Sequence, residues 1–231
     1  MTAGSADGAP VDGRAARWQG HKASRRADLA NEARKAIHRL GAEASMDDLA
    51  AALGTSKSIL YRYFADKTGL QHAVGEVVVT RMLAALVEAS HASVTARENL
   101  HSVIGVYLEM VEGSPSVYTF VTQVPAAPQS PTDGGSPLSS FLDAVSSRVL
   151  APIAESLLAD DVGGGDVTDA VVQTWAAGAV GFVRGAGDRW LATPETERTQ
   201  DRHALTDEVT TWLWTGVAGL AVANRYQQEK P

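Results

Sequence analysis

The chain has 231 residues, 45% of them hydrophobic, which is enough for one large globular domain or for a small domain joined to a larger one. It contains no cysteine, and this excludes disulfides, thiolate catalysis and cysteine-based zinc or iron–sulfur sites. The N-terminal stretch has no apolar run, and the weakly polar stretches 170–183 and 212–223 are shorter than the roughly 20 residues that span a bilayer. We therefore expect a soluble, cytoplasmic protein that does not enter a membrane.

The net charge of -7 is unevenly distributed along the chain. Residues 1–70 hold 11 Lys/Arg and 8 Asp/Glu, whereas residues 71–231 hold 9 Lys/Arg and 19 Asp/Glu. Within the first part, residues 14–43 carry eight basic and three acidic side chains. A basic N-terminal part on an acidic body favours contact between the N-terminal part and a polyanion, although scattered surface charge would give the same distribution.

The N-terminal segment changes character at about residue 20. Residues 1–20 are predicted to form a disordered basic arm, because small and polar residues at its start offer nothing to bury. Helical periodicity begins after Ser24 and ends before Gly41, a residue type that commonly terminates helices.

Three further helices follow at short intervals. Ser45, with acidic residues in the turn after it, is a typical N-cap of a second helix that ends at Gly54. Thr55 or Ser56 caps a third, short helix. Asp66 caps a fourth helix that extends to about residue 91.

The rest of the chain is also predicted to be helical. Segment 123–136 is rich in Pro, Ser, Thr and Gly and is expected to be a loop that gates a binding site. Pro152 lies inside a predicted helix and should kink it. No segment shows sustained period-2 alternation, so the predicted fold is all-α with about nine helices and no repeats. The later helical segments are 100–113, 115–120, 136–159, 166–191 and 201–224.

The stretch 45–63 carries the clearest functional pattern. Two short helices joined by a turn containing Gly54 form a helix-turn-helix. The second helix is polar on one side, where Lys57, Ser58, Tyr61 and Arg62 lie. A DNA major groove admits one α-helix, and donors near its N-terminus can reach base edges. The spacing alone leaves open a helical hairpin that serves only packing.

The residues go beyond spacing. Segments 45–50, 54–64 and 66–70 resemble the N-terminal DNA-binding domain of the TetR/AcrR family of bacterial transcriptional regulators. The resemblance covers about residues 25–72 and includes Leu-Tyr-x-x-Phe from Leu60 and Lys-x-x-Leu from Lys67. It implies a helix-turn-helix domain over 21–68, a ligand-binding and dimerisation domain over 69–231, and a homodimeric repressor whose binding to a double-stranded DNA operator responds to a small-molecule effector.

The resemblance also implies roles for individual side chains. The positions of Lys57, Ser58 and Ile59 face bases, although the family often has Gly-Thr where this chain has Ser58 and Ile59, and Ile59 cannot donate a hydrogen bond. Some matching positions contact phosphates, others cap helices that touch the DNA backbone, and basic residues before the first helix can reach the minor groove. The DNA-binding candidates are Arg25, Arg26, Ser45, Thr55, Ser56, Lys57, Ser58, Ile59, Tyr61, Arg62, Tyr63 and Lys67.

Small residues recur on one face of each of the last two predicted helices. Glycine inside a helix costs about 0.5–1 kcal/mol relative to alanine, so a stripe of glycines favours the close approach of another helix. The resemblance implies a dimer formed through the last two helices, which makes this stripe a candidate dimer interface. The alternative is that the stripe packs against helices of the same subunit. The residues of the stripe are Gly178, Gly181, Gly185, Gly216, Gly219 and Ala223.

The effector site is predicted from apolar side chains on wide helical faces. Arg184 lies among small and apolar residues and is either at an exposed rim or paired with a ligand anion. Segments 113–120 and 188–191 look like actinobacterial TetR-type regulators of lipid metabolism, some of which sense fatty acyl-CoA. This resemblance favours a fatty acyl-CoA or fatty acid as effector, with a planar aromatic compound as the alternative. The candidate residues are Met82, Leu86, Ile104, Tyr107, Leu108, Phe120, Phe141, Leu142, Trp175 and Phe182.

No catalytic or metal-binding motif is present in the sequence. The six histidines are scattered without the i, i+3 or i+4 spacing of metal ligands, and neither a nucleophile elbow nor a phosphate loop occurs. We expect no enzymatic activity, no cofactor and no metal site. Two other classes remain as alternatives, an enzyme of unknown type and a helical lipid carrier that does not bind DNA.

Overall fold

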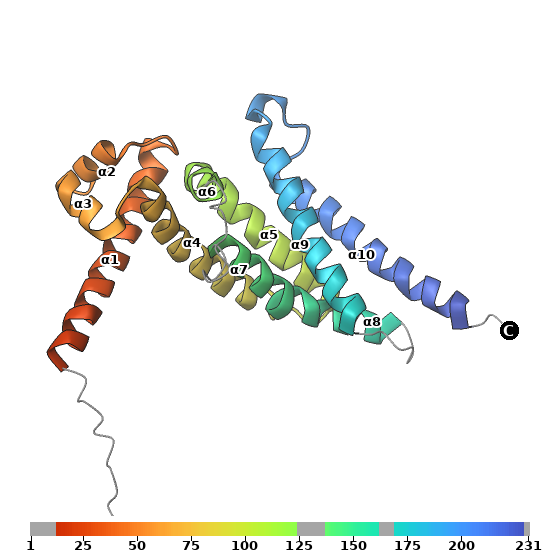
Figure 1. Cartoon of the computed structure of the whole chain (residues 1–231). Helices are drawn as coiled ribbons and strands as arrows, with labels where there is room; N and C mark the ends of the chain where they lie inside the picture. Colours follow the sequence, from red (N-terminus) through yellow and green to blue (C-terminus); the bar gives the residue numbers. More distant parts are fainter. Residues whose placement is uncertain (1–12, 124–136, 162–168, 229–231) are drawn as a thin grey trace, which may run out of the picture.

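The computed structural model describes residues 13–123, 137–161 and 169–228, and the side chains of 13–16, 157–161 and 217–228 lie outside the description. Within these ranges helices joined by short turns make up the chain, as predicted, and there is no strand. Figure 1 shows a small N-terminal head, formed by the long α1 and the short α2 and α3, on one side and a larger helical bundle on the other, with α4 joining the two.

The head is formed by three helices, and its interior is closed by parts of two others. Their bounds are α1 (Gly13–Leu40), α2 (Met46–Ala52), α3 (Lys57–Phe64), α4 (Lys67–Ala89) and α6 (Pro115–Thr122). Apolar residues of all five elements share one core, which we call the head core; it includes Ile37, Leu49, Leu60, Leu70 and Phe120.

The first helix begins earlier than predicted. It starts at Gly13, and the prediction of a disordered arm is therefore wrong for residues 13–20, while residues 1–12 lie outside the described residues. Ala, Arg and Gln make up five of these eight residues and are strong helix formers, which favours helix without tertiary contacts. Trp18 and Lys22, one helical turn apart, also interact, with the Lys22 Nζ 5.7 Å from the Trp18 ring centroid.

The body contains the remaining long helices around a second core. Their bounds are α5 (Ala96–Gly113), α7 (Pro137–Val145), η1 (Ser146–Leu150), α8 (Ala151–Asp161), α9 (Asp169–Ala192) and α10 (Arg202–Gln228), with a short 3-10 turn η2 (Glu195–Glu197) before α10. The body core includes Leu86, Leu100, Leu108, Val149 and Ala176, all nearly inaccessible to solvent.

The kink predicted at Pro152 takes the form of a π-helical turn. The segments α7, η1 and α8 follow one another without a break, and η1 is π-helical. Proline lacks an N–H and its ring crowds the preceding turn, so an i→i−5 pattern before it relieves the strain on the ladder. The N–H of Ala151 accordingly donates to the carbonyl of Ser146.

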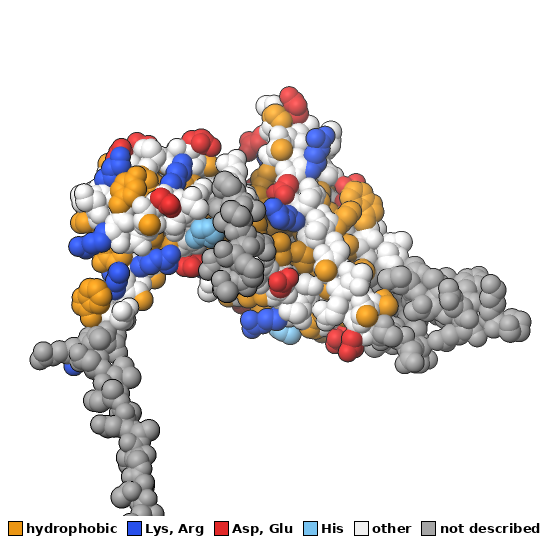
Figure 2. All heavy atoms as spheres, viewed as in Figure 1, with side chains coloured by type: hydrophobic (Ala, Val, Ile, Leu, Met, Phe, Trp, Pro, Cys, Tyr) orange, Lys and Arg blue, Asp and Glu red, His pale blue; other side chains and the backbone are white. Residues whose placement is uncertain are grey.

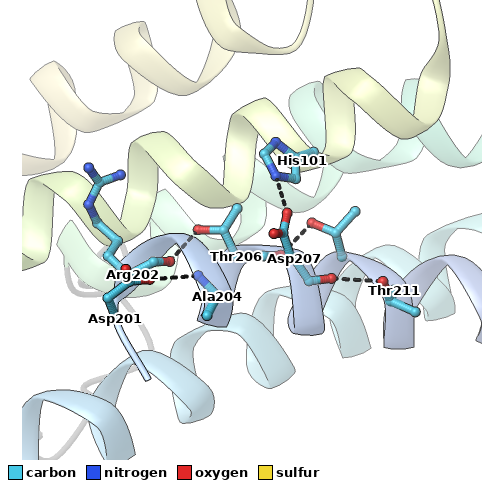
Figure 3. A network of polar contacts seen from close by, with 8 residues as sticks. His101, Asp201, Arg202, Ala204, Thr206, Asp207 and Thr211 are labelled. Carbon is cyan, nitrogen blue, oxygen red and sulfur yellow. Dashed lines mark hydrogen bonds and ion pairs between the residues drawn. The ribbon is translucent and has the colours of Figure 1, made fainter. Parts of the chain in front are cut away.

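Helix α10 is fastened to α5 by polar contacts at its N-terminal end, some of which are drawn in Figure 3. The Nε of Arg202 donates to Glu112 over 3.0 Å, and the Nε2 of His101 lies 2.9 Å from Asp207 Oδ1. Asp201 caps α10 by accepting from the N–H of Ala204, and this bond holds the pKa of the Asp201 carboxyl below its usual range. These contacts fix the register between α5 and α10.

Helix α4 is the connection between head and body. By length and composition it could cross a membrane, but its apolar residues are distributed between two protein cores. Leu70 and Val74 belong to the head core, and Met82 and Leu86 belong to the body core. The apolar composition of α4 is therefore accounted for by its packing on two sides.

Candidate functional site

The helix-turn-helix is built from local signals of the sequence. Ser45 caps α2 through a reciprocal pair, because its hydroxyl accepts from the N–H of Asp48 at 3.2 Å and its own N–H donates to Asp48 Oδ2 at 2.9 Å. The bond from the Ser45 hydroxyl lowers the pKa of the Asp48 carboxyl. Gly54 has a φ of +63°, a conformation that glycine adopts at little cost, and it turns the chain toward α3.

Helix α3 presents a polar face to solvent. Leu60 and Phe64 are buried in the head core, whereas Lys57, Ser58 and Arg62 are exposed and Tyr61 is 41% exposed. Lys57 Nζ donates to Asp47 Oδ2 over 2.8 Å, which raises the pKa of Lys57. On the face shown in Figure 2, Lys and Arg side chains gather over the head.

Other DNA-binding candidates have contacts inside the head. Ser56, and not Thr55, caps α3, because its hydroxyl accepts from the N–H of Ile59. Ile59 and Tyr63 are half-buried and pack against the head core. Their position allows only part of each side chain to reach a ligand.

The basic residues near the head are placed differently from one another. Arg25 is exposed. Arg26 forms an ion pair with Glu76 at 3.0 Å, and its guanidinium lies 5.6 Å from the Phe64 ring centroid. Lys67 opens α4 and lies 5.8 Å from the ring centroid of Phe120. Arg26 and Lys67 therefore both contact aromatic residues of the head core.

The body contains a cavity of about 70 Å³, lined by residues of α4, α5, α6, α7, η1 and α9. A cavity needs only about 10–15 Å³ of such volume to hold one water molecule, so this cavity can hold a ligand larger than a single water. Six predicted effector residues line it, namely Met82, Leu86, Ile104, Tyr107, Phe141 and Leu142. The remaining wall consists of Val78, Val79, Val103, Tyr118, Val121, Thr122, Leu138, Val145, Leu150, Val180, Val183 and Arg184.

Four predicted effector residues lie elsewhere among the described residues. Leu108 is fully buried in the body core, and Trp175 packs against that core. Phe120 belongs to the head core. Phe182 is 42% exposed and forms an edge-to-face pair with Trp212, with ring centroids 5.8 Å apart. Each of these four residues lies on a face of its helix that does not point into the cavity, so none of them lines it.

A polar group of four residues, three of which line the cavity, adjoins its apolar wall. The Tyr118 hydroxyl donates to Asp188 Oδ1 over 2.5 Å, and the Tyr107 hydroxyl lies 3.2 Å from that of Tyr118. Arg184 lies one helical turn from Asp188, with its Nε 3.6 Å from Asp188 Oδ2. Sequence inspection noted Arg184 but missed Tyr118 and Asp188 as partners, because α6 and α9 meet only in the folded chain.

Helix α6 connects the cavity to the head. Tyr118 faces the cavity, whereas Val117 and Phe120 belong to the head core. The carbonyl of Phe120 accepts from Gln71 Nε2 of α4 at 3.2 Å. Ser114 occupies the N-cap position of α6 but makes no side-chain cap bond; its hydroxyl lies 3.0 Å from His38 Nδ1 of α1. A shift of α6 at the cavity must therefore move contacts with both α1 and α4.

Four glycines of the stripe on the last two helices face open space in the described chain. A Cβ placed at Gly178, Gly181, Gly185 or Gly216 would meet no atom within 4 Å, so these glycines are not explained by packing among the described residues. Gly219 and Ala223 lie in the part of α10 whose side chains are outside the description. The exposed pair Phe182 and Trp212 comes from the same two helices.

Within 13–123, 137–161 and 169–228, no cluster of three His, Asp or Glu side chains is placed to hold a metal ion. The exposed face of α3, the body cavity and the glycine stripe are the candidate sites of this chain.

Two family models match separate parts of this chain. Residues 29–74 match the model of the family described as "Bacterial regulatory proteins, tetR family", and residues 85–229 match "Tetracyclin repressor-like, C-terminal domain". A relative from Mycobacterium tuberculosis (strain H37Rv), named as an uncharacterized HTH-type transcriptional regulator, is 32% identical over 217 residues, or 92% of this chain and 86% of the relative.

Solved structures of low sequence identity share the fold. A TetR-family transcriptional regulator from Pectobacterium atrosepticum superposes with a TM-score of 0.65 at 22% identity, over 87% of this chain and 96% of that chain. The regulator FadR from Bacillus subtilis, solved in complex with stearoyl-CoA, superposes with a TM-score of 0.61 at 15% identity, over 81% of this chain and 97% of that chain.

Proposed function

Because the chain belongs to the TetR family of bacterial transcriptional regulators, we propose that it represses transcription as a homodimer and leaves its operator when a mainly apolar effector occupies the body cavity. The observation that carries the proposal is the combination of a capped helix-turn-helix with an apolar cavity whose wall includes α6, a helix of the head core. A family of regulators that bind DNA in the cytoplasm also supports a cytoplasmic location.

DNA recognition is assigned to the exposed face of α3. Lys57 and Ser58 lie at the start of the helix, where side chains can reach base edges, and Tyr61 and Arg62 lie one turn later. Ser45 and Ser56 hold the N-terminal ends of α2 and α3, whose N–H groups favour phosphate. The ion pair of Lys57 with Asp47 must open for Lys57 to contact DNA.

Dimerisation is assigned to the stripe on α9 and α10. Two heads must be held at a fixed distance to read two half-sites separated by about one helical turn of DNA, roughly 34 Å. Helix backbones can approach closely at Gly178, Gly181 and Gly185, and the exposed Phe182 and Trp212 rings beside them offer apolar area to a partner.

The effector would act by moving α6 against the head. Filling the cavity displaces Tyr118, and because Val117 and Phe120 lie on the same short helix, the displacement reaches the head core. A coupling of about 1–3 kcal/mol between DNA and effector is typical of such two-state elements. An acyl chain is the favoured effector, since the wall is almost wholly apolar and a structural neighbour was solved with stearoyl-CoA.

The DNA-binding part is tested by selecting genomic fragments with the purified protein and footprinting the enriched sequence. We expect a two-fold symmetric operator, bound more weakly as salt rises. The absence of any enriched sequence, together with no duplex binding at low salt, would refute this part.

The effector part is tested by operator release with fatty acyl-CoA of increasing chain length. Leu142→Trp adds volume at the cavity wall and should reduce the response. Leu83→Trp is the matched control, because Leu83 is similarly half-buried on the body core but is not part of the wall. Equal responses of the two variants, or affinity independent of chain length, would remove the cavity from the mechanism and leave the DNA-binding assignment intact.

A further inference from the structure

The polar group in the cavity wall has a defined order of donors and acceptors. Tyr118 has one hydroxyl proton, and it is used in the 2.5 Å bond to Asp188 Oδ1. Tyr107 must then donate to the Tyr118 oxygen, from which it lies 3.2 Å. Burial raises the pKa of both tyrosines, so both remain protonated at neutral pH. Neither hydroxyl has a proton left for a ligand.

Arg184 supplies the donor that the tyrosines lack. Its Nε is buried and has no hydrogen-bond partner among the described residues. The carboxylate of Asp188 lies 3.6 Å from it, which is beyond hydrogen-bond distance. The Nε keeps its ion pair with Asp188 but has no acceptor within hydrogen-bond distance, so a ligand oxygen placed there would add a hydrogen bond.

The charges of this group decide which acceptor fits. The positive charge of Arg184 and the negative charge of Asp188 lie side by side on α9 and cancel at a distance. An uncharged carbonyl oxygen accepts a hydrogen bond from Arg184 and leaves the net charge of the Arg184–Asp188 pair at zero. A carboxylate would place a second anion beside Asp188 and would lose its own hydration on entering the apolar wall.

We propose that Arg184 donates to the polar head of the effector, that Asp188 balances its charge, and that this pair selects an ester or thioester carbonyl over a free carboxylate. This inference rests on the effector cavity of the proposed function and names the chemistry of its ligand. The side chains of Arg184 and Asp188 are 36% and 44% exposed, so the carbonyl lies where the cavity meets solvent. A polar group beyond the carbonyl can then remain outside while the acyl chain fills the apolar part.

The test compares two ligands of equal chain length, methyl decanoate and decanoate, by calorimetric titration of the full-length protein at pH 7.5. The wild type should bind the ester about tenfold or more tightly than the carboxylate. The ester gains a hydrogen bond from the charged Arg184, whereas the carboxylate must also place a second anion beside Asp188. Equal affinities, or a preference for decanoate, would overturn the proposal.

Two variants separate the donor from the charge. Arg184→Leu should weaken methyl decanoate about tenfold, while Arg189→Leu, an exposed arginine of the same helix, should not change binding. Asp188→Asn keeps an acceptor for the Tyr118 hydroxyl but removes the negative charge, so the site becomes positive. Decanoate should therefore bind more tightly, and the preference for methyl decanoate over decanoate should narrow or reverse. An unchanged preference in Asp188→Asn would overturn the charge argument even if Arg184→Leu fails to fold.

The two proposals fail in different ways. If Leu142→Trp does not impair methyl decanoate binding, or if neither ligand binds the wild type, the effector cavity itself is refuted and the head-group inference falls with it. If the ester binds in the cavity but the wild type does not discriminate against the carboxylate, only the head-group inference is refuted. Operator affinity without ligand is measured in parallel and tests the DNA-binding part separately.

Discussion

Phe120 is the residue through which α6 holds the head, and its truncation should loosen the head selectively. Its side chain is 1% exposed and belongs to the head core, which also includes Leu60 and Ile37. Burying a phenylalanine removes about 150–250 Å² from water, and at about 25 cal/mol per Å² this contributes about 4–6 kcal/mol. Phe120→Leu removes three of the seven side-chain carbons, so it should cost about 2 kcal/mol, or about 4–8 °C in Tm.

The matched control is Phe141→Leu, since Phe141 is also buried, at 8% exposure, but belongs to the body core and the cavity wall. Amide hydrogen exchange then distinguishes the two sites. Phe120→Leu should speed exchange in α1 and the first half of α4, whereas Phe141→Leu should speed it in α5 and α7. Unchanged protection of α1 in Phe120→Leu, or the same exchange pattern in both variants, would refute the role of α6 as the link.

Three further predictions concern the DNA face, the dimer and acid stability. Lys57→Ala should weaken operator binding and relax preference at one base position, whereas Lys67→Ala should weaken all duplex binding and lower the salt dependence by about one unit, as measured by titrations at several salt concentrations. Gly181→Leu should dissociate the dimer in light scattering, and Gln173→Leu, exposed on the same helix off the stripe, should not. The lowered pKa of Asp48 contributes stability that is present above its unfolded-state pKa and is lost as pH falls through the folded-state value. In denaturant titrations, the difference in unfolding free energy between wild type and Asp48→Asn should therefore be largest near neutral pH and shrink under acid. A difference independent of pH would contradict this prediction.

The helix ends of the head were predictable because their signals lie within a few residues. Ser45 and Asp66 bond to N–H groups three residues later, and Gly54 adopts a positive φ inside its own turn. Such interactions need no knowledge of the rest of the chain. The same holds for the helix-turn-helix pattern, and the family models confirm the membership to which it points.

Which core or cavity each side chain occupies depends on tertiary packing. Phe120 and Tyr118 are two residues apart on one short helix, yet the first joins the head core and the second faces the cavity. Hydrophobicity is non-directional, so composition alone does not say which of two cores a residue enters. Ser114 shows the same limit for polar groups, because a hydroxyl suited to a cap instead meets His38 from a helix 76 positions away.

The sequence by itself determined the helices, the capped helix-turn-helix and the exposed polar face of α3, since each follows from propensity, periodicity and bonds between neighbours. Only the tertiary structure decided that α6 closes the head core, that α9 brings Arg184 and Asp188 to Tyr118, and that the stripe glycines face outward. The physical reason is that these contacts join segments distant in sequence, and their geometry is set by how whole helices pack.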